Sequence, residues 1–308
     1  MRSAAQRPQG PSARGVVAPR APRTRLPGGA PLPAPRNGRA ARRAPPALPA
    51  VPSGVEALLA AAMSPHPGLA AGAAANSAVF AAGIQVLLKG LTWEGVANSW
   101  LLGTLVYSAF GLGGYLLVCL YFIFGTLVTK VKLEQKQKEG IAEARSGRRS
   151  AGSVWGSGSA GAACAALALA TGNYWLWGVG FVASFTSKLS DTVSSEIGKA
   201  YGKTTYLITT LQRVPRGTEG AVSAEGTAAG AAAALFFSFV ALAVGQVDPQ
   251  GAAVAAAAAV AANLFESWLG AAVQGRVGWL TNDVVNAVQI TVAAGLAVAL
   301  TYALTPLG

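Results

Sequence analysis

The sequence predicts an all-α protein, a polytopic membrane bundle of about 7–8 transmembrane helices. Of the 308 residues, 52% are hydrophobic and only 12% are charged, whereas an average soluble domain carries about 25% charged residues. The mean hydropathy is +0.43, although the first sixty residues are polar and rich in proline. Apolar runs near the length that crosses a bilayer recur from residue 68 onward.

Residues 1–60 are predicted to be a disordered organelle transit peptide and linker. Ten of the 24 basic residues are arginines within residues 1–50, and none of the 12 acidic residues lies there. An arginine-rich, acid-free segment without an apolar core is typical of transit peptides rather than secretory signals. Its proline and glycine content opposes a packed fold. The alternatives are a disordered basic tail or a start codon placed too early, and composition does not separate plastid from mitochondrion.

Residues 61–308 are predicted to form a single transmembrane helical domain. Small residues are abundant in its apolar runs, as in Ala252–Ala262, and they let membrane helices pack closely. The second and fifth runs are short, which leaves a choice between seven and eight spans. The candidate spans are 68–88, 95–110, 112–129, 152–170, 173–188, 224–246, 250–273 and 284–305.

The polar connections predict the sidedness of the bundle. They are residues 130–150, 187–222 and 274–283, and two spans separate each from the next. With eight spans, all three lie on one face of the membrane and both ends of the helical domain lie on the other. Because positive loops stay on the cytosolic or stromal side, this charged face is expected to be stromal in a plastid.

The segment Ser187–Lys203 is the densest cluster of candidate functional residues. If it is helical, Asp191, Ser195, Lys199 and Gly202 share one face at spacings of three and four. A carboxylate that holds a metal, a lysine and open backbone amides are the partners that phosphates require. The alternative is a packing face of small residues whose polar members happen to reach the interface.

Two further segments are expected on the same face. In 213–227, Ser223 is predicted to cap the following helix with Glu225 in its first turn, and such a helix start favours anions. In 263–286, Glu266 and Asp283 lie at or within apolar runs, where carboxylates are often functional. The alternatives are an interhelical hydrogen bond for Glu266 and an N-cap for Asn282. By contrast, the mixed charges of 130–150 predict a solvated amphipathic helix.

These segments resemble the transmembrane-protein-19-like family of integral membrane proteins over roughly residues 70–306. The resemblance is strongest in SFTSKLSDTVSSEIGKAYGKTTYLITTLQRVPRGTEGAVSAEGTAAG, residues 184–230, and in ESWLGAAVQ, residues 266–274. A lysine-rich stretch ending in Gly147-Arg148-Arg149 follows the family pattern. Asn282-Asp-Val-Val-Asn286 departs from the usual N-E-x-V-N by a shorter carboxylate.

The plant branch of that family includes a plastid phytyl-phosphate kinase. The resemblance therefore implies a chloroplast membrane enzyme, in the envelope or the thylakoid. It would convert phytyl monophosphate to phytyl diphosphate with CTP or another nucleoside triphosphate, for tocopherol (vitamin E) and phylloquinone synthesis. Its partners would be an isoprenoid lipid phosphate and membrane lipid, with no nucleic acid, while the triphosphate and the oligomeric state stay open.

For such phosphoryl transfer we expect Mg²⁺ and a set of anion-binding residues. Lys199 and Arg216 would act with Asp191 in catalysis. The metal would be held by Asp191 and Glu196, with Glu219, Glu225 and Asp283 as second-rank candidates. The nucleotide and phosphate groups would contact Arg148, Arg149, Lys203, Arg213, Gly217, Thr218, Gly220 and Ser223.

Three other functions fit the same residues. A phytol or polyprenol kinase would use a base such as Asp191 on a free alcohol, and a lipid cytidylyltransferase would release diphosphate. A membrane transporter is the alternative from another class, but transporters place polar residues near the midplane and show two-half symmetry. The polar residues here gather at one face instead.

Overall fold

The computed structural model describes residues 53–143, 148–273 and 277–305, and they form helices together with one small sheet. The predicted transit peptide lies outside these residues and stays a prediction. The helix α1 takes up Ser53–Ala62, so the last residues of the predicted linker are helical. The other helices are α2 Gly68–Gly90, α3 Trp93–Thr129, α4 Leu133–Lys138, α5 Ala151–Thr171, α6 Tyr174–Tyr201, α7 Ala224–Ala243, α8 Pro249–Ala272 and α9 Asn282–Leu304.

Six of the described helices are long and apolar enough to cross a membrane, namely α2, α3, α5, α7, α8 and α9. The helix α6 also runs from end to end of the bundle, although its second half is polar. Near its start, Trp175 Nε1 lies 3.4 Å from Asp248 Oδ2, in the connection before α8. At its other end, the Ala200 carbonyl accepts a hydrogen bond from Lys132, in the charged 130–150 connection.

The helix α3 reverses direction at Gly111 and therefore accounts for two spans. Gly111 has φ +57° and ψ −157°, which no helix contains. The Thr92 amide, just before α3, donates to the Arg149 carbonyl, and a Cβ at Gly125 would touch the Arg149 guanidinium. Thirty residues of straight helix span about 45 Å, so both ends of α3 can reach Arg149 only if the chain turns back. The predicted spans 95–110 and 112–129 are these two halves.

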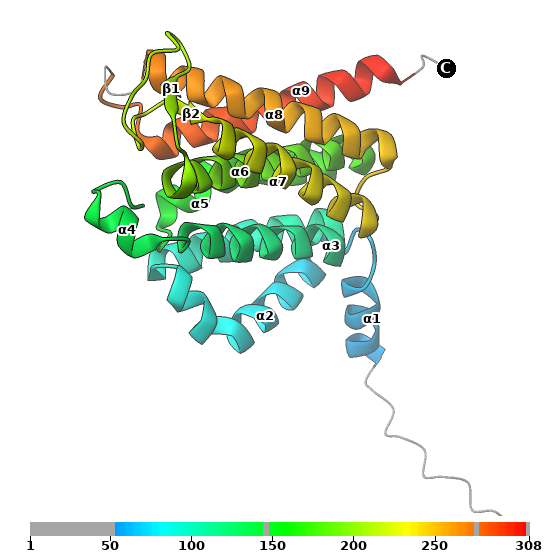
Figure 1. Ribbon diagram of the computed structural model, residues 1–308. Helices are drawn as coiled ribbons and strands as arrows, with labels where there is room; N and C mark the ends of the chain where they lie inside the picture. The colour runs from blue at the N-terminus through cyan, green and yellow to red at the C-terminus, as the bar shows by residue number, and fades with distance from the viewer. Residues whose placement is uncertain (1–52, 144–147, 274–276, 306–308) are drawn as a thin grey trace, which may run out of the picture. The chain divides into compact units, whose positions relative to one another are not determined.

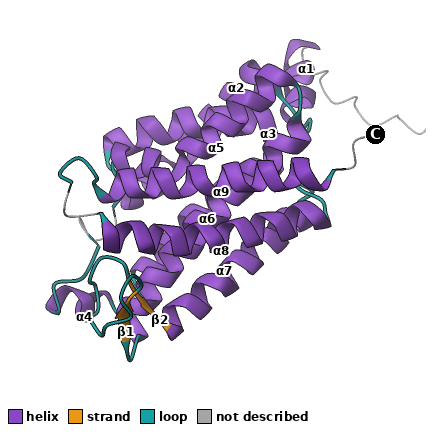
Figure 2. Ribbon diagram, turned by 90° about the horizontal axis from the view of Figure 1, so that it is seen from above, coloured by secondary structure: helices purple, strands orange, loops and turns teal. Residues whose placement is uncertain are grey.

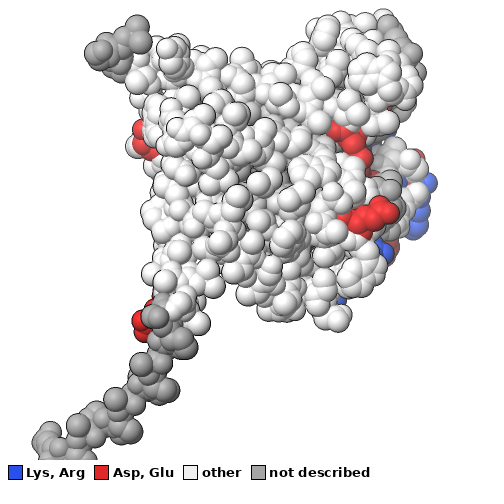
Figure 3. Space-filling model, turned by 180° about the vertical axis from the view of Figure 1, so that it is seen from behind, with Lys and Arg blue, Asp and Glu red and all other residues white. Residues whose placement is uncertain are grey.

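The all-α membrane bundle is confirmed, and of the two predicted counts, seven and eight, these contacts favour eight, while the stromal side stays a prediction. The described part of the chain crosses eight times, and the connections at 130–150, 187–222 and 274–283 meet at one end, which we call the charged end. Lys and Arg gather at one edge of the surface, while most of the rest of the visible face is uncharged (Figure 3). The helix α1 and the end of α9 lie away from that edge, at the opposite end (Figure 1).

The helix α6 forms the centre of the bundle (Figures 1 and 2). Val179, Phe181 and Val182 are fully buried, and the Phe181 ring stacks on Phe110 of α3. A Cβ at Gly161 of α5 would lie 2.5 Å from the Phe185 ring, so α5 approaches α6 closely only because residue 161 is glycine. This packing fixes the polar second half of α6 at the charged end.

The structure corrects three local predictions. The connection after α6 contains a two-stranded antiparallel sheet, β1 Thr205–Leu207 with β2 Ala221–Ser223. The polar sequence does not predict this sheet. Thr281 caps α9 rather than Asn282, because its hydroxyl accepts from the Val284 amide. Of the described residues in the 130–150 connection, which leave out 144–147, only Leu133–Lys138 are helical, and Lys136 is fully buried rather than solvated. The predicted cap of α7 is confirmed, since Ser223 Oγ accepts from Gly226 N at 3.1 Å.

Candidate active site

A polar cavity of about 240 Å³ opens at the charged end, where all three long connections contribute to its wall. Helices α5, α6, α8 and α9 supply the other sides. Among the residues that the structure describes, ten ionisable side chains line it, apart from Tyr121. The cations are Arg148, Arg149, Lys188 and Lys199, and the carboxylates are Glu143, Asp191, Glu196, Glu219, Glu266 and Asp283.

The floor of the cavity is built around Lys188 on α6. Its ammonium donates to Asp191 Oδ2 at 2.6 Å and to Asn286 Oδ1 of α9 at 2.8 Å. Both Lys188 and Asp191 are buried. The sequence placed Asp191 in this site but overlooked Lys188, because a lysine three residues before an aspartate also fits an ordinary helix-surface pair.

Two arginines stand on the α5 side of the cavity. The Arg149 backbone is held by the α2–α3 connection, because its amide donates to the Gly90 carbonyl and its carbonyl accepts from Thr92. The Arg149 guanidinium lies 4.7 Å from the centroid of the Tyr121 ring and donates to the Tyr121 hydroxyl. Arg148 donates to the Leu91 carbonyl. The Arg149 guanidinium, fixed in this way by Tyr121, is held in a set direction, as phosphate recognition requires.

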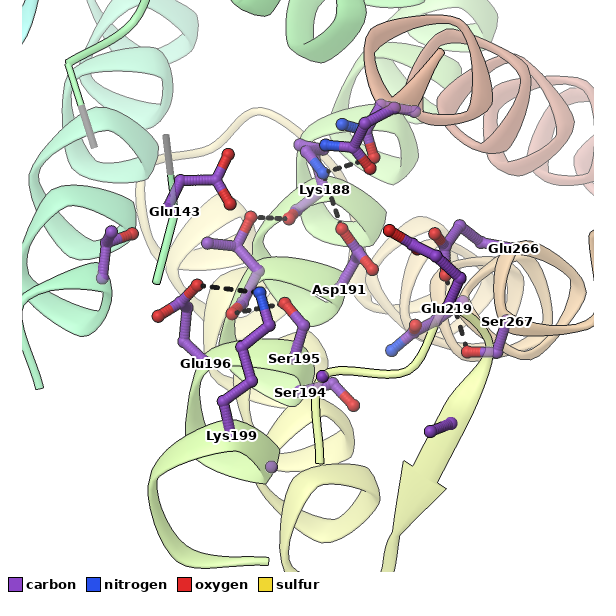
Figure 4. Close-up of a pocket in the computed structure, with 18 of the residues that line it drawn as sticks. Glu143, Lys188, Asp191, Ser194, Ser195, Glu196, Lys199, Glu219, Glu266 and Ser267 are labelled. Atoms are coloured by element: carbon purple, nitrogen blue, oxygen red, sulfur yellow. Dashed lines mark hydrogen bonds and ion pairs between the residues drawn. The ribbon is translucent and has the colours of Figure 1, made fainter. Parts of the chain in front are cut away.

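Carboxylates dominate the α8 side. Figure 4 shows Lys188 and Asp191 between Glu143 on one side and Glu219 and Glu266 on the other. Glu219 is brought to α8 by Gly220, which has φ +71°. A Cβ on Gly220 would lie 2.5 Å from the Ser267 carbonyl oxygen, so only glycine lets the loop approach α8 here.

Glu196 is engaged in structural ion pairs at the mouth of the cavity. It pairs with the buried Lys136 of α4, and its other oxygen lies 3.6 Å from Lys199 Nζ. Glu196 is five residues from Asp191 on the same helix, which places the two side chains about 140° apart around its axis. The structure therefore does not bring Asp191 and Glu196 together on one ion.

The structure gathers most of the predicted site residues into this cavity. Gly217, Thr218, Gly220, Ser223 and Asp283 line it, together with the acidic and basic residues already described. Gly198 and Gly202 lie against Ser223, so they let the start of α7 approach α6, the backbone contact that the sequence suggests.

Four predicted residues do not line the cavity: Lys203, Arg213, Arg216 and Glu225. Arg216 instead holds two connections together, because its guanidinium donates to both Glu139 carboxylate oxygens, at 2.9 and 3.0 Å. Glu225 lies in the first turn of α7, as expected, but not on the cavity side. The positions of Lys203, Arg213 and Arg216 depend on the path of the 203–222 connection, and that of Glu225 depends on the rotation of α7 about its axis. The sequence alone sets neither.

The predicted Mg²⁺ stays a prediction, and the donor set shows how these residues could hold it. Among the described residues, no group of three or more His, Cys, Asp or Glu side chains is close enough to enclose a metal ion. However, Mg²⁺ in phosphoryl-transfer sites usually takes one or two carboxylates, and substrate phosphates and water supply the other ligands. The carboxylates and cations that the described residues contribute to the lining fit a cavity that receives a polyanion together with a divalent cation.

The fold and this cavity define a polytopic integral membrane protein with a polar site at one end of its bundle. The family described as "Integral membrane protein DUF92" matches residues 76–294, and the chain belongs to that family. Membership agrees with the predicted membrane fold, and the matched region begins within α2 and ends within α9.

The relatives of the chain come from a plant, a cyanobacterium and an archaeon. "Protein VTE6, chloroplastic" of Arabidopsis thaliana is 50% identical over 229 residues, which is 72% of this chain and 69% of the relative. "Uncharacterized membrane protein sll0875" of Synechocystis is 46% identical over 72% of this chain and 87% of its own. "Uncharacterized membrane protein MJ0933" of Methanocaldococcus jannaschii is 33% identical over 68% and 84%. No solved structure matches the chain.

Proposed function

We propose that the protein is a membrane-embedded lipid-phosphate kinase, which converts phytyl monophosphate to phytyl diphosphate with CTP or another nucleoside triphosphate. The observation that carries this proposal is the cavity at the charged end, where fixed arginines and lysines face a group of carboxylates. A triphosphate needs the cationic groups, and its divalent cation needs the carboxylates. A lipid phosphate enters the cavity from the bilayer, at the charged end of the bundle.

The chain's relationship to a chloroplastic plant protein supports a plastid setting. We place the protein in the plant branch of a family that resembles the transmembrane-protein-19-like proteins. It is a multi-pass protein of the chloroplast envelope or thylakoid with the charged end in the stroma, where a nucleotide is available. Its product then serves tocopherol and phylloquinone synthesis.

The reaction forms a bond between an oxygen of the lipid phosphate and the γ-phosphorus of the triphosphate. The bond from the γ-phosphorus to the β–γ bridging oxygen breaks, and a nucleoside diphosphate leaves. Because the attacking phosphate is already anionic, no general base is required, and positioning with charge neutralisation provides the catalysis. The scarcity of histidine, with His66 alone in the sequence, is compatible with this chemistry.

The residues of the cavity divide these tasks by position. Arg148, Arg149 and Lys199 bind phosphate oxygens, and Lys188 fixes the orientation of Asp191. Asp191 and Glu266 are the residues that would hold Mg²⁺, with Glu219 beside them (Figure 4). When bound, Mg²⁺ supplies positive charge that neutralises the phosphates as they approach one another.

The test is a transfer assay with two isotopic labels. Purified protein in nanodiscs receives Mg²⁺, phytyl monophosphate and CTP that carries ³²P at either the γ or the α position. A kinase moves only the γ label into the lipid and gives phytyl diphosphate. Transfer of the α label would identify a cytidylyltransferase, and phytol as the better acceptor would identify a polyprenol kinase. A folded sample that labels no lipid with any triphosphate contradicts the proposal and favours transport.

A further inference from the structure

A second, smaller hollow lies between helices α6, α7 and α8, beside the polar cavity. Its inner wall is polar, with Ser190, Ser194 and Asn263. Ser190 donates to the Gly230 carbonyl at 2.9 Å and accepts from Asn263 Nδ2 at 3.1 Å. The outer wall is formed by Val222, Thr227, Ala231, Val260 and Leu264. We call this hollow the α7–α8 crevice.

The crevice and the polar cavity are neighbours. Four of the described residues line both spaces, namely Ser194, Val222, Asn263 and Ser267. A molecule whose phosphate lies in the cavity beside Glu266 therefore has the crevice directly beside it.

The outer side of the crevice faces the lipid-exposed surface of the bundle. Leu264 on its wall is 46% exposed, and Trp268, one turn further along α8, is 48% exposed. Figure 2 shows α7 and α8 diverging from their short connection toward the charged end. The divergence arises because glycines draw α7 onto α6 instead: Cβ atoms at Gly226 and Gly230 would lie 2.6 and 2.8 Å from Ser194 atoms.

The size of the crevice limits what it can hold. Its volume is about 20 Å³, and a hollow of roughly 10–15 Å³ on this measure holds one water molecule. It therefore has room for one methyl-sized group rather than a whole chain, and the rest of an occupant must lie along the exposed apolar faces of α7 and α8.

We propose that the α7–α8 crevice receives the methyl branch nearest the phosphate of an isoprenoid lipid phosphate, so that the protein selects branched over straight acyl or alkyl chains. The inference rests on the proposed function for the position of the phosphate. An isoprenoid carries its first methyl branch three carbons from the phosphate oxygen, which is the part of the chain that leaves the cavity. A straight chain places no side group there.

Ala231 and Val260 are the specificity-determining residues in this account. The wild-type protein is expected to prefer phytyl monophosphate over hexadecyl monophosphate by roughly ten-fold or more in kcat/KM, as one methyl group in a fitted pocket provides. Ala231→Leu fills the crevice and removes the preference, while KM for CTP stays unchanged. Ala232→Leu, on the exposed neighbouring position of α7, is the matched control and keeps the preference. If Ala231→Leu does not fold, Val260→Ala provides the test instead. It widens the crevice without overpacking and is expected to weaken the preference for the branched chain.

A cross-linking arm separates failure of this inference from failure of the proposed function. The probe is an isoprenyl monophosphate with a photoreactive diazirine at its first branch, used in nanodiscs without nucleotide. We expect mass spectrometry to find it on Thr227, Ala231, Val260 or Leu264, and excess phytyl monophosphate to displace it. Labelling there without any kinase activity would keep the crevice and reject the kinase. Labelling elsewhere, displacement by ordinary phosphatidylglycerol, or equal behaviour of Ala231→Leu and Ala232→Leu in an active enzyme would overturn the crevice assignment.

Discussion

The two ends of the bundle use their polar residues differently. At the opposite end, polar side chains cap the first turns of helices. Asp248 Oδ1 accepts from the Gly251 amide of α8, and Asn173 Oδ1 accepts from the Leu176 amide of α6. Gly172 and Gly245, both with positive φ, follow α5 and α7 there. At the charged end, the side chains of the cavity floor lie inside helices rather than at cap positions, so capping does not require them. These residues are Lys188, Asp191, Glu266 and Asn286.

The difference teaches how to recognise a site in a protein with few charges. Helix ends need caps at both faces of the membrane. The opposite end shows that a small number of polar residues is enough to provide them. Buried ionisable residues that do not cap a helix cost free energy, and they therefore point to a function. The comparison predicts that substitutions of the ionisable residues on the cavity floor reduce turnover, whereas those at the opposite end reduce only stability.

The largest effect is expected for Asp191→Asn. The substitution removes a charge from the cavity floor but keeps the size of the side chain, so turnover of phytyl monophosphate should fall roughly 100-fold or more. The radiolabel assay measures it, on samples whose unfolding temperature lies well above the assay temperature. Glu134→Gln, an exposed carboxylate on α4, is the matched control. Turnover of Asp191→Asn within three-fold of wild type would refute a role of this carboxylate in catalysis.

The next effect concerns the ion pair between Lys136 and Glu196. Both side chains are almost fully buried, with relative exposures of 1% and 3%. Lys136→Met leaves the Glu196 charge poorly compensated and should lower the free energy of unfolding by about 3–5 kcal/mol. The double variant Lys136→Met/Glu196→Leu should recover most of this loss, and thermal unfolding in detergent measures both. A single variant as stable as wild type would show that the pair does not hold α4 on α6.

At the opposite end, the reversal of α3 offers a stability test. An Ala at position 111 would need φ near +57°, and its Cβ would lie 2.8 Å from the Ser64 carbonyl oxygen and 2.9 Å from that of Pro65. Gly111→Ala should therefore cost about 1–3 kcal/mol of stability, with kcat per folded molecule unchanged. Gly83→Ala in α2 is the control, since its Cβ would meet no atom within 4 Å. An unchanged unfolding temperature for Gly111→Ala would argue against the reversal.

The smallest effect is expected for Asp248→Ala. Loss of the α8 N-cap should lower stability by about 1 kcal/mol, and turnover should stay within two-fold of wild type. Denaturation curves and the radiolabel assay, run on the same preparation, measure the two quantities. A large loss of turnover at constant stability would remove the distinction between the two ends.

The sequence predicts the spans well because hydropathy reports them directly. The break between 95–110 and 112–129, the Ser223 cap and the face of α6 that carries Asp191 are all local patterns. The burial of Lys136 depends on Glu196, 60 residues away, and alternating charges around it resemble a solvated helix. Whether Lys203, Arg213 and Arg216 reach the cavity depends on the path of the loop that contains β1 and β2. The polar sequence of this loop has no periodicity that predicts the pairing of the two strands.

The central claim is that phosphoryl transfer occurs at the charged end, and nucleotide supplied to one side of the membrane tests it most directly. The protein is reconstituted in sealed vesicles, and its orientation is determined by protease cleavage in the 130–150 connection, with γ-labelled CTP added outside only. The account predicts that label enters phytyl monophosphate only in the molecules whose charged end faces outward, and that the protease-inaccessible fraction contributes nothing. Equal labelling by molecules whose opposite end faces the CTP would contradict it.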